Sequence, residues 1–283
     1  MQIIRHASEM QETAEKIRLS GRRIGIVPTM GFLHQGHLSL IARAKENSDV
    51  VVTTIFVNPT QFGPGEDLER YPRNFERDEK LAREAGTDIL FYPDAKEMYP
   101  AGYLTYVGSE RVSTMLEGKF RPTHFRGVTT VVAKLLNIVK PHVALFGQKD
   151  AQQAFIIRQM VKDLNFDVSV TIAPIVREQD GLALSSRNVY LSPSERSNAT
   201  VLFRSLKLAE QRITEGIRNS SRIRKEMEEV LRSANPSAID YVAFLRPDDF
   251  AETDAVAPPS VLIALAVRFG TTRLIDNIIV SVN

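Results

Sequence analysis

Residues 24 to 37 read IGIVPTMGFLHQGH, and the organisation of the chain can be worked out from this stretch. It begins with a short apolar run, Ile24 to Val27, that ends at Pro28, as expected of a buried strand. A turn containing Gly31 follows, and the segment from Gly36 to Glu46 repeats its apolar residues with helical spacing. A strand, a glycine turn and a helix in this order indicate one βα unit of an α/β fold.

The same alternation continues along the first two-thirds of the chain. Strands are expected at residues 49–57, 89–92, 143–146 and 168–172, and helices at residues 8–19, 74–85, 128–139 and 151–164. Ser8 with Gln11 matches a capping box, and Asn74 is a suitable N-cap. Repeated βα units of this size predict an α/β fold with a doubly wound, Rossmann-like, mostly parallel sheet.

The pattern changes after about Pro174. Ser192 to Glu195 is a capping box with a proline at the first helical position, and a helix with a long apolar stripe is expected behind it. A second helix is expected at residues 222–233 and strands at 239–245, 261–267 and 274–280. We therefore expect two domains, residues 1–176 and a smaller α+β C-terminal lid domain at residues 177–283.

Composition narrows the classes of function. The net charge is +2, and the basic runs at residues 21–23 and 222–225 are short, so no nucleic-acid partner is expected, with an RNA-binding module kept as an alternative. The absence of cysteine excludes disulfides and thiol nucleophiles and fits a reducing compartment. Apolar runs are shorter than the roughly 20 residues that cross a bilayer, and residues 1–6 lack signal-peptide features. We expect a cytoplasmic protein without a membrane partner.

The turn after the first strand carries the clearest chemistry. Its backbone N–H groups and the positive end of the following helix make an anion site. His34 and His37 lie three residues apart where that helix begins, so their rings can donate hydrogen bonds to the same phosphate group. A metal-binding pair and a merely packed helix start are the alternatives. A helix start disfavours a charged imidazole and a triphosphate favours it, so His37 is either an acid or a neutral donor.

Two further clusters have residue types that suit a nucleotide. Residues 147–150 read GQKD at the end of an expected strand, where open α/β folds bind ligands, and Lys149 suits a phosphate. Residues 180–188 read DGLALSSRN, and two hydroxyls beside a guanidinium can clamp phosphate oxygens. Taken alone, the first cluster is better read as a glycine turn with an N-cap aspartate, and the second as only a polar loop. Together with the histidine turn, the second is expected to be a mobile lid.

Taken together, these segments resemble the pantothenate synthetase family, within the superfamily that includes nucleotidyltransferases and class I aminoacyl-tRNA synthetases. The resemblance rests on residues 29–37, FVNPTQF at 56–62, YPR at 71–73, Arg121 with HFRGV at 124–128, residues 147–153 and residues 184–188. They occur in the family's order and roughly its spacing, densely over residues 1–190. One departure is Gln148, where a glutamate is expected more often.

The resemblance implies an ATP-dependent ligase that condenses pantoate with β-alanine through a pantoyl-adenylate, giving pantothenate, AMP and pyrophosphate. It also implies that Mg²⁺ accompanies ATP and that the chain forms a homodimer. A nucleotidyltransferase that joins AMP to a phosphorylated small molecule is the main rival. Residues 63–73 are read either as a flap over the adenylate or as a surface loop.

The resemblance assigns roles to particular residues. His37, His34 and Lys149 would be catalytic, with His37 as the proton donor, and the amides of Gln61 and Gln153 would bind pantoate and β-alanine. The ATP contacts would come from Met30, Gly31, Phe32, Leu33, His34, Gln35, Gly36, His37, Gly147, Gln148, Lys149, Asp150, Val176, Leu184, Ser185, Ser186 and Arg187. The protein ligands of Mg²⁺ stay unknown, with Asp78 as one candidate.

Overall fold

The computed structural model describes residues 1–283 and divides them into two compact units, each with its own hydrophobic core. The first unit comprises Met1–Gly147 and Gln152–Pro174, and the second comprises Gln148–Ala151 and Ile175–Asn283. A short segment inside the first two-thirds of the chain therefore belongs to the C-terminal unit. The functional division of the chain after residue 176 stays a prediction.

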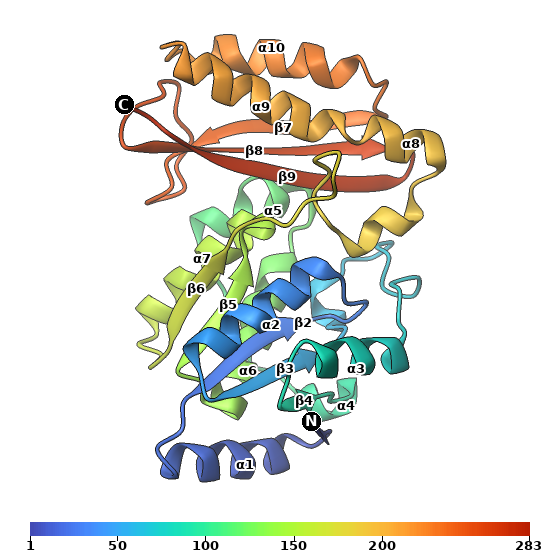
Figure 1. Ribbon diagram of the computed structural model, residues 1–283, viewed down its shortest axis with the longest axis vertical. Helices are drawn as coiled ribbons and strands as arrows, with labels where there is room; N and C mark the ends of the chain where they lie inside the picture. Colours follow the sequence, from blue (N-terminus) through green and yellow to red (C-terminus); the bar gives the residue numbers. More distant parts are fainter. The chain divides into compact units, whose positions relative to one another are not determined.

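The first unit is built on a six-stranded parallel sheet (Figure 1). Its strand order is β1-β4-β3-β2-β5-β6, with β1 at Gln2–Ile4, β2 at Ile24–Thr29, β3 at Val50–Ile55, β4 at Ile89–Phe91, β5 at Val143–Gly147 and β6 at Ser169–Ala173. The predicted doubly wound sheet is confirmed. Strand β1 was not expected, because three residues are too few to show a period.

The sequence suggested that the strand ends at Pro28, but β2 does not end there. The strand continues to Thr29, and Pro28 pairs in register with Thr54 of β3. On its other side β2 pairs with β5 only through Gly25 and Ile26, so the missing N–H of Pro28 breaks no bond to that neighbour.

Helices cover both faces of this sheet. On one face, α1 (Ala7–Leu19), α6 (His124–Val139) and α7 (Ala151–Asp163) contribute to the largest apolar cluster. On the other, α2 (Gln35–Asn47) and α3 (Phe75–Glu84) pack on separate, smaller clusters. The connections contain η1 (Pro59–Gln61), α4 (Ala95–Met98), η2 (Arg111–Thr114) and α5 (Glu117–Phe120). All six residues of β3 are buried, as expected of a strand covered on both sides.

The helix starts were predicted with mixed success. Helix α1 has His6 as its N-cap and no side-chain cap, so the capping box at Ser8 is wrong: Ser8 lies inside the first turn. The cap at Asn74 is confirmed, because its side chain accepts a hydrogen bond from the backbone N–H of Arg77. Helix α6 begins at His124, one turn before the expected start at Val128.

The second unit contains a three-stranded antiparallel sheet, which confirms the smaller α+β part. Its strands are β7 (Ala238–Leu245), β8 (Ser260–Phe269) and β9 (Thr272–Ser281), and α9 (Val201–Thr214) and α10 (Ser220–Arg232) pack against it (Figure 1). The remaining helices are η3 (Gln148–Asp150), η4 (Ser186–Tyr190) and α8 (Pro193–Asn198). The capping box at Ser192 is confirmed, but the helix behind it is divided into α8 and α9.

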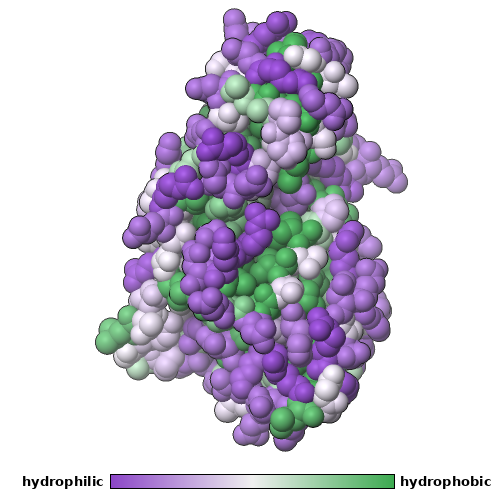
Figure 2. All heavy atoms as spheres, turned by 90° about the vertical axis from the view of Figure 1, so that its left-hand side faces the viewer, coloured by the Kyte–Doolittle hydropathy of each residue, from purple (hydrophilic) through white to green (hydrophobic).

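Figure 2 shows one face, on which hydrophilic residues predominate and apolar atoms are exposed only in places. A helix of sufficient length and apolar character to cross a membrane does not occur in the structure.

Candidate active site

The segment from Met30 to His37 follows β2 at the point where the strand order of the sheet reverses. Strand β2 has β3 on one side and β5 on the other, and the chain continues outward from each. Ligands of open α/β sheets bind at the carboxyl ends of the strands at such a switch point. Residues 30–37 therefore lie where the sheet itself offers a binding site.

The turn at the end of β2 has an unusual backbone. Gly31 has φ of +85° and Phe32 has φ of +48°, so two successive residues adopt the left-handed region that favours glycine. The hydroxyl of Thr29 accepts a hydrogen bond from the Gly31 N–H at 3.1 Å and donates one to the carbonyl of Thr54 at 2.7 Å. These bonds tie the start of the turn to β3.

A buried carboxylate from α3 holds the next two residues of the turn. Asp78 is 1% exposed, and its two oxygens accept the backbone N–H groups of Phe32 at 2.6 Å and Leu33 at 2.7 Å. Burial raises the pKa of Asp78, while these N–H groups and the nearby Arg77 guanidinium act in the opposite direction. Because both oxygens accept N–H groups of the turn, Asp78 shapes the backbone there, and its role as a magnesium ligand stays a prediction.

The two histidines cap the start of α2 with their own side chains. His34 Nδ1 accepts the Gly36 N–H at 3.2 Å, and His37 Nδ1 accepts the His34 N–H at 3.2 Å. The two ring centroids are 4.0 Å apart. A ring nitrogen that accepts a hydrogen bond carries no proton, so each neutral ring holds its proton on Nε2. The geometry thus favours neutral Nε2–H donors over charged imidazolium groups.

The side chain of Gln61 lies beside the same turn. Its Nε2 donates to the Met30 sulfur at 2.8 Å, and its Oε1 accepts from Asn58 Nδ2 at 3.1 Å. The Asn58 oxygen is in turn held by the hydroxyls of Thr60 and Tyr99, at 2.9 and 2.8 Å. A buried chain of hydrogen bonds therefore sets the orientation of the Gln61 amide.

Two residues quoted among the sequence motifs hold the backbone of Gln61. His124 Nδ1 donates to the Gln61 carbonyl at 2.9 Å, and Arg121 donates to the same oxygen at 3.1 Å. Arg121 also donates to His124 Nε2 at 3.3 Å and pairs with Glu66 at 2.6 Å. Burial lowers the pKa of His124 to about 4, and the Arg121 charge acts in the same direction. His124 is thus a neutral structural group.

The other candidate amide, Gln153, lies half-buried in the first turn of α7. Its neighbour Gln152 is buried and has a structural role, because its Nε2 donates to the carbonyls of Val112 and Met115 and its Oε1 accepts the Glu117 N–H. Of these two adjacent amides, Gln153 is the more exposed one.

A cavity of about 260 Å³ borders the turn on the side of β3 and β4. Its lining includes Met30, two arginines, Arg5 and Arg73, and two aspartates, Asp78 and Asp94. The Arg5 guanidinium lies 4.9 Å from the centre of the Tyr92 ring. The lining therefore carries two basic and two acidic residues, so its charges balance and the cavity does not by itself favour an anion.

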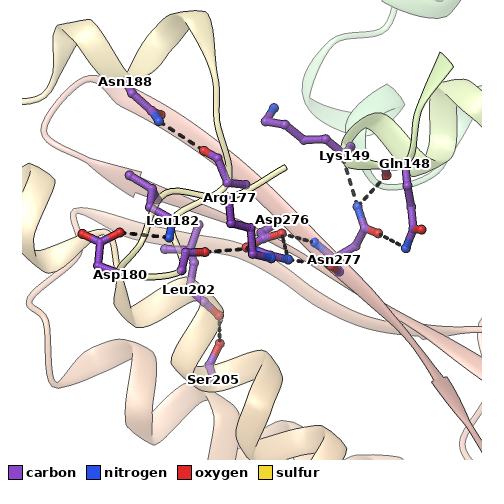
Figure 3. Close-up of polar contacts among 12 residues, drawn as sticks. Gln148, Lys149, Arg177, Asp180, Leu182, Asn188, Leu202, Ser205, Asp276 and Asn277 are labelled. Carbon is purple, nitrogen blue, oxygen red and sulfur yellow. Dashed lines mark hydrogen bonds and ion pairs between the residues drawn. The ribbon is translucent and has the colours of Figure 1, made fainter. Parts of the chain in front are cut away.

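In the second unit, η3 carries Gln148, Lys149 and Asp150 (Figure 3). The side chain of Asn277 on β9 donates to the carbonyl oxygens of Gln148 at 2.9 Å and Lys149 at 3.0 Å. Gln148 Nε2 donates to the Asn277 oxygen at 3.2 Å. The Gln148 side chain therefore helps to orient the Asn277 amide, and a carboxylate at position 148 would have no N–H to donate.

The same unit contains the Val176 to Arg187 segment. Leu184 N–H donates to the Val176 carbonyl at 3.0 Å and Glu178 N–H to the Leu182 carbonyl at 2.8 Å, which makes a narrow antiparallel turn. Ser185 then caps η4 by accepting the Arg187 N–H at 3.2 Å. Ser185, Ser186 and Arg187 are therefore presented on a short helical turn, and their role as a lid stays a prediction.

The candidate residues fall into two groups. Residues 30–37, Gln61, Gly147 and Gln153 belong to the first unit, and Gln148–Asp150, Val176 and Leu184–Arg187 belong to the second. Sequence reasoning gave no role to Asn58, Arg121, His124 or Asn277, although the first three stand in quoted motifs. No group of three or more His, Asp or Glu side chains suited to a metal ion occurs in the structure.

The chain is similar to several known proteins over nearly its whole length. The family model of pantoate–beta-alanine ligase matches residues 2–279. A pantothenate synthetase of Acetivibrio thermocellus is 54% identical over 282 residues, covering 100% of both chains. The crystal structure of pantothenate synthetase from Thermus thermophilus superposes with a TM-score of 0.93 at 44% identity, covering 98% of this chain and 99% of that one.

A second solved structure bears on the ligands. The pantoate–beta-alanine ligase of Francisella tularensis is 33% identical, with a TM-score of 0.81 over 98% of this chain and 97% of that one. It is described as complexed with beta-gamma ATP and beta-alanine. The resemblance carried by the sequence motifs is thereby confirmed: the chain belongs to the pantoate–beta-alanine ligase family.

Proposed function

We propose that this protein is an ATP-dependent ligase that condenses pantoate with β-alanine to give pantothenate, AMP and pyrophosphate. The observation that carries the proposal is the match of nearly the whole chain, residues 2–279, to the pantoate–beta-alanine ligase family. The Francisella tularensis relative, whose structure holds an ATP compound and beta-alanine, supports two of the three substrates.

The chemistry needs an activated acid, because the oxide that would leave a free carboxylate is a poor leaving group. A pantoate carboxylate oxygen attacks the α-phosphorus of ATP, and the bond to the β-phosphate oxygen breaks with release of pyrophosphate. The β-alanine amine then attacks the carbonyl carbon of the pantoyl-adenylate, AMP leaves, and the amine loses a proton. Both steps depend mainly on positioning and on stabilising negative charge.

The first unit supplies the turn and the amides. We assign ATP contacts to residues 30–37 and place the Nε2–H groups of His34 and His37 on its phosphates as neutral donors. Met30 and the oriented amide of Gln61 lie beside each other, so this pair would bind the acid being activated, with Gln153 as the second amide. The neutral tautomers support hydrogen-bond donation rather than transfer of a proton by His37.

The second unit supplies further groups for the phosphates. We assign ATP contacts to Gly147–Asp150, where the chain passes from one unit to the other, and to Val176 and Leu184–Arg187. Lys149 and Arg187 bring positive charge, and the hydroxyls of Ser185 and Ser186 bring donors. Formation of one site requires both groups to reach the same triphosphate.

Three further features belong to the proposal. Mg²⁺ would accompany ATP, held by phosphate oxygens and water, because hydrated Mg²⁺ commonly binds through substrate phosphates. We also propose that the chain works as a homodimer in the cytoplasm. Size determination in solution tests the assembly.

The test of the reaction is AMP release. With ATP present, AMP should form only when pantoate and β-alanine are both added, and pantothenate should appear in equal amount. A stable dinucleotide product would instead indicate a nucleotidyltransferase, and no pyrophosphate release with any substrate mixture would indicate a binding module.

The residue roles have their own test. His37→Ala and Lys149→Ala should each abolish adenylate formation, measured as pantoate-dependent exchange of pyrophosphate into ATP. Circular dichroism and thermal unfolding confirm that each variant folds. Turnover close to that of the unaltered protein in a folded variant would refute the role assigned to that residue.

A further inference from the structure

Strand β9 carries two adjacent polar residues, Asp276 and Asn277, that are each only 2% exposed. They interrupt an otherwise apolar stretch from Leu274 to Ile279, and neither is among the candidate ATP-binding residues. A buried carboxylate or amide is costly unless it is hydrogen-bonded. Their partners therefore indicate what these two residues do.

Asn277 uses its side chain entirely on η3. Its Nδ2 has two N–H groups, and the two donate to the carbonyls of Gln148 and Lys149, at 2.9 and 3.0 Å (Figure 3). Its Oδ1 accepts the Gln148 amide at 3.2 Å. Two hydrogen bonds thus hold the backbone that presents Lys149, and a third orients the Asn277 amide. The lysine side chain extends from η3 on the side where Arg177 and Asn188 lie (Figure 3).

Asp276 uses its carboxylate on the other candidate segment. Arg177 donates to both carboxylate oxygens, at 2.6 and 2.9 Å, as a bidentate ion pair (Figure 3). The same guanidinium donates to the carbonyls of Gly181 at 3.0 Å and Asn277 at 3.2 Å. Burial raises the pKa of Asp276, and the Arg177 charge opposes that shift.

Fixing Arg177 also fixes the residues that lead into the Ser185–Arg187 segment. Arg177 forms a β-bridge with Ala183, and the flanking Val176 carbonyl accepts the Leu184 N–H at 3.0 Å. Ser185 follows directly and caps η4. Asp276 therefore acts on the serines through one ion pair and one short turn.

We propose that Asp276 and Asn277 are positioning residues that hold Lys149 and the Ser185–Arg187 segment at a fixed spacing, so that both reach the phosphates of one ATP molecule. Since the two residues are neighbours on one strand, a single backbone sets that spacing. The inference rests on the proposed function, and it adds residues that touch neither ATP nor the reacting acids.

The second unit offers a matched control for a general loss of stability. Asp240 on β7 is half-buried as a residue, with its side chain 6% exposed, and it pairs with Arg273 at 2.6 Å and Arg268 at 3.1 Å in the same sheet. These pairs lie among the strands and not on η3 or residues 176–187. Asp240→Asn therefore weakens a carboxylate–arginine ion pair in the same sheet without touching either candidate segment.

The experiment compares Asp276→Asn, Asn277→Ala and Asp240→Asn with the unaltered protein. Isothermal titration with β,γ-methylene ATP should give a Kd raised about tenfold in the first two variants, the effect of losing about one net hydrogen bond. The KM for ATP should rise by a similar factor to the Kd. The KM values for pantoate and β-alanine should stay within about twofold of those of the unaltered protein. Asp240→Asn should unfold at a lower temperature but keep its affinity for the ATP analogue.

Amide hydrogen exchange gives a readout independent of turnover. Protection at residues 148–151 should fall in Asn277→Ala and protection at residues 177–188 in Asp276→Asn, with neither change in Asp240→Asn. Unchanged ATP affinity in both β9 variants, or an equal loss in Asp240→Asn, would overturn the proposal. If Asp276→Asn does not fold, Asn277→Ala, which removes no charge, carries the test. Absence of AMP release by the unaltered protein would refute the proposed function instead.

Discussion

Replacing Asp78 with asparagine tests whether the backbone of the turn at residues 30–37 depends on one carboxylate. Asparagine keeps the size of the side chain and one acceptor oxygen, but its Nδ2 donates and cannot accept. One of the N–H groups of Phe32 and Leu33, now bound at 2.6 and 2.7 Å, would therefore lose its acceptor and face another donor.

The size of the effect follows from these contacts. A hydrogen bond to a charged group contributes about 1.5–3 kcal/mol, and a buried N–H without a partner costs about 1–3 kcal/mol. These two energies describe largely the same lost hydrogen bond, so they are not added. We therefore expect the native turn to be destabilised by about 3 kcal/mol. The nearby Arg77 adds little, since its side chain is 42% exposed. A free-energy change of about 1.4 kcal/mol alters an equilibrium constant tenfold. The ratio of the native turn to open forms therefore falls roughly a hundredfold.

The assay is steady-state AMP release with ATP varied at saturating pantoate and β-alanine. We expect kcat/KM for ATP to fall by up to about a hundredfold in Asp78→Asn, with the fold retained. Glu76→Gln is the matched control, because it removes the same charge from the same first turn of α3 at an exposed position. A folded Asp78→Asn variant with kcat/KM within threefold of Glu76→Gln would refute the reasoning.

Three other predictions follow from the site. The pKa of His124 is lowered to about 4 in the folded protein, while a histidine in an unfolded chain has a pKa near 6.5. The free energy of unfolding should therefore be unaffected above pH 6.5 and should decrease by about 3 kcal/mol as the pH falls to 4. Urea unfolding at several pH values, compared with that of His124→Gln, measures this. Gly127→Ala should destabilise the protein despite the better helix propensity of alanine, because the new Cβ would lie 2.3 Å from the Thr60 carbonyl oxygen; a raised melting temperature would contradict this. His34→Asn should keep the cap on the Gly36 N–H but lose Nε2, so its activity should fall as in His34→Ala while its melting temperature stays higher.

Much of the fold could be predicted from local patterns. The buried strands and the amphipathic helices each repeat over enough residues to show a period, and they gave the parallel sheet and the smaller α+β part. Strand β1 could not be found in this way, and Pro28 misled because its effect depends on which neighbour a strand has at that point. Helix starts were uncertain because several polar residues in one stretch are each able to cap.

The candidate site was predicted only where its residues stand close in sequence. The residue types of the turn at residues 30–37 indicate its chemistry directly. Its contact with Asp78, however, joins residues more than forty positions apart, and no local sequence pattern predicts it. Asn277 reaches η3 across an even longer separation. One sign was present: Asp276 and Asn277 are consecutive polar residues inside a strand, which breaks the period of two and indicates that one of them has a buried polar partner.

The dependence of the turn on α3 limits how the site can be transplanted. A decapeptide with the sequence of residues 28–37, grafted after a parallel strand of another protein, would bring both imidazoles but not the carboxylate that keeps Gly31 and Phe32 left-handed. A transplant of this turn should therefore include the first turn of α3, which carries Asp78.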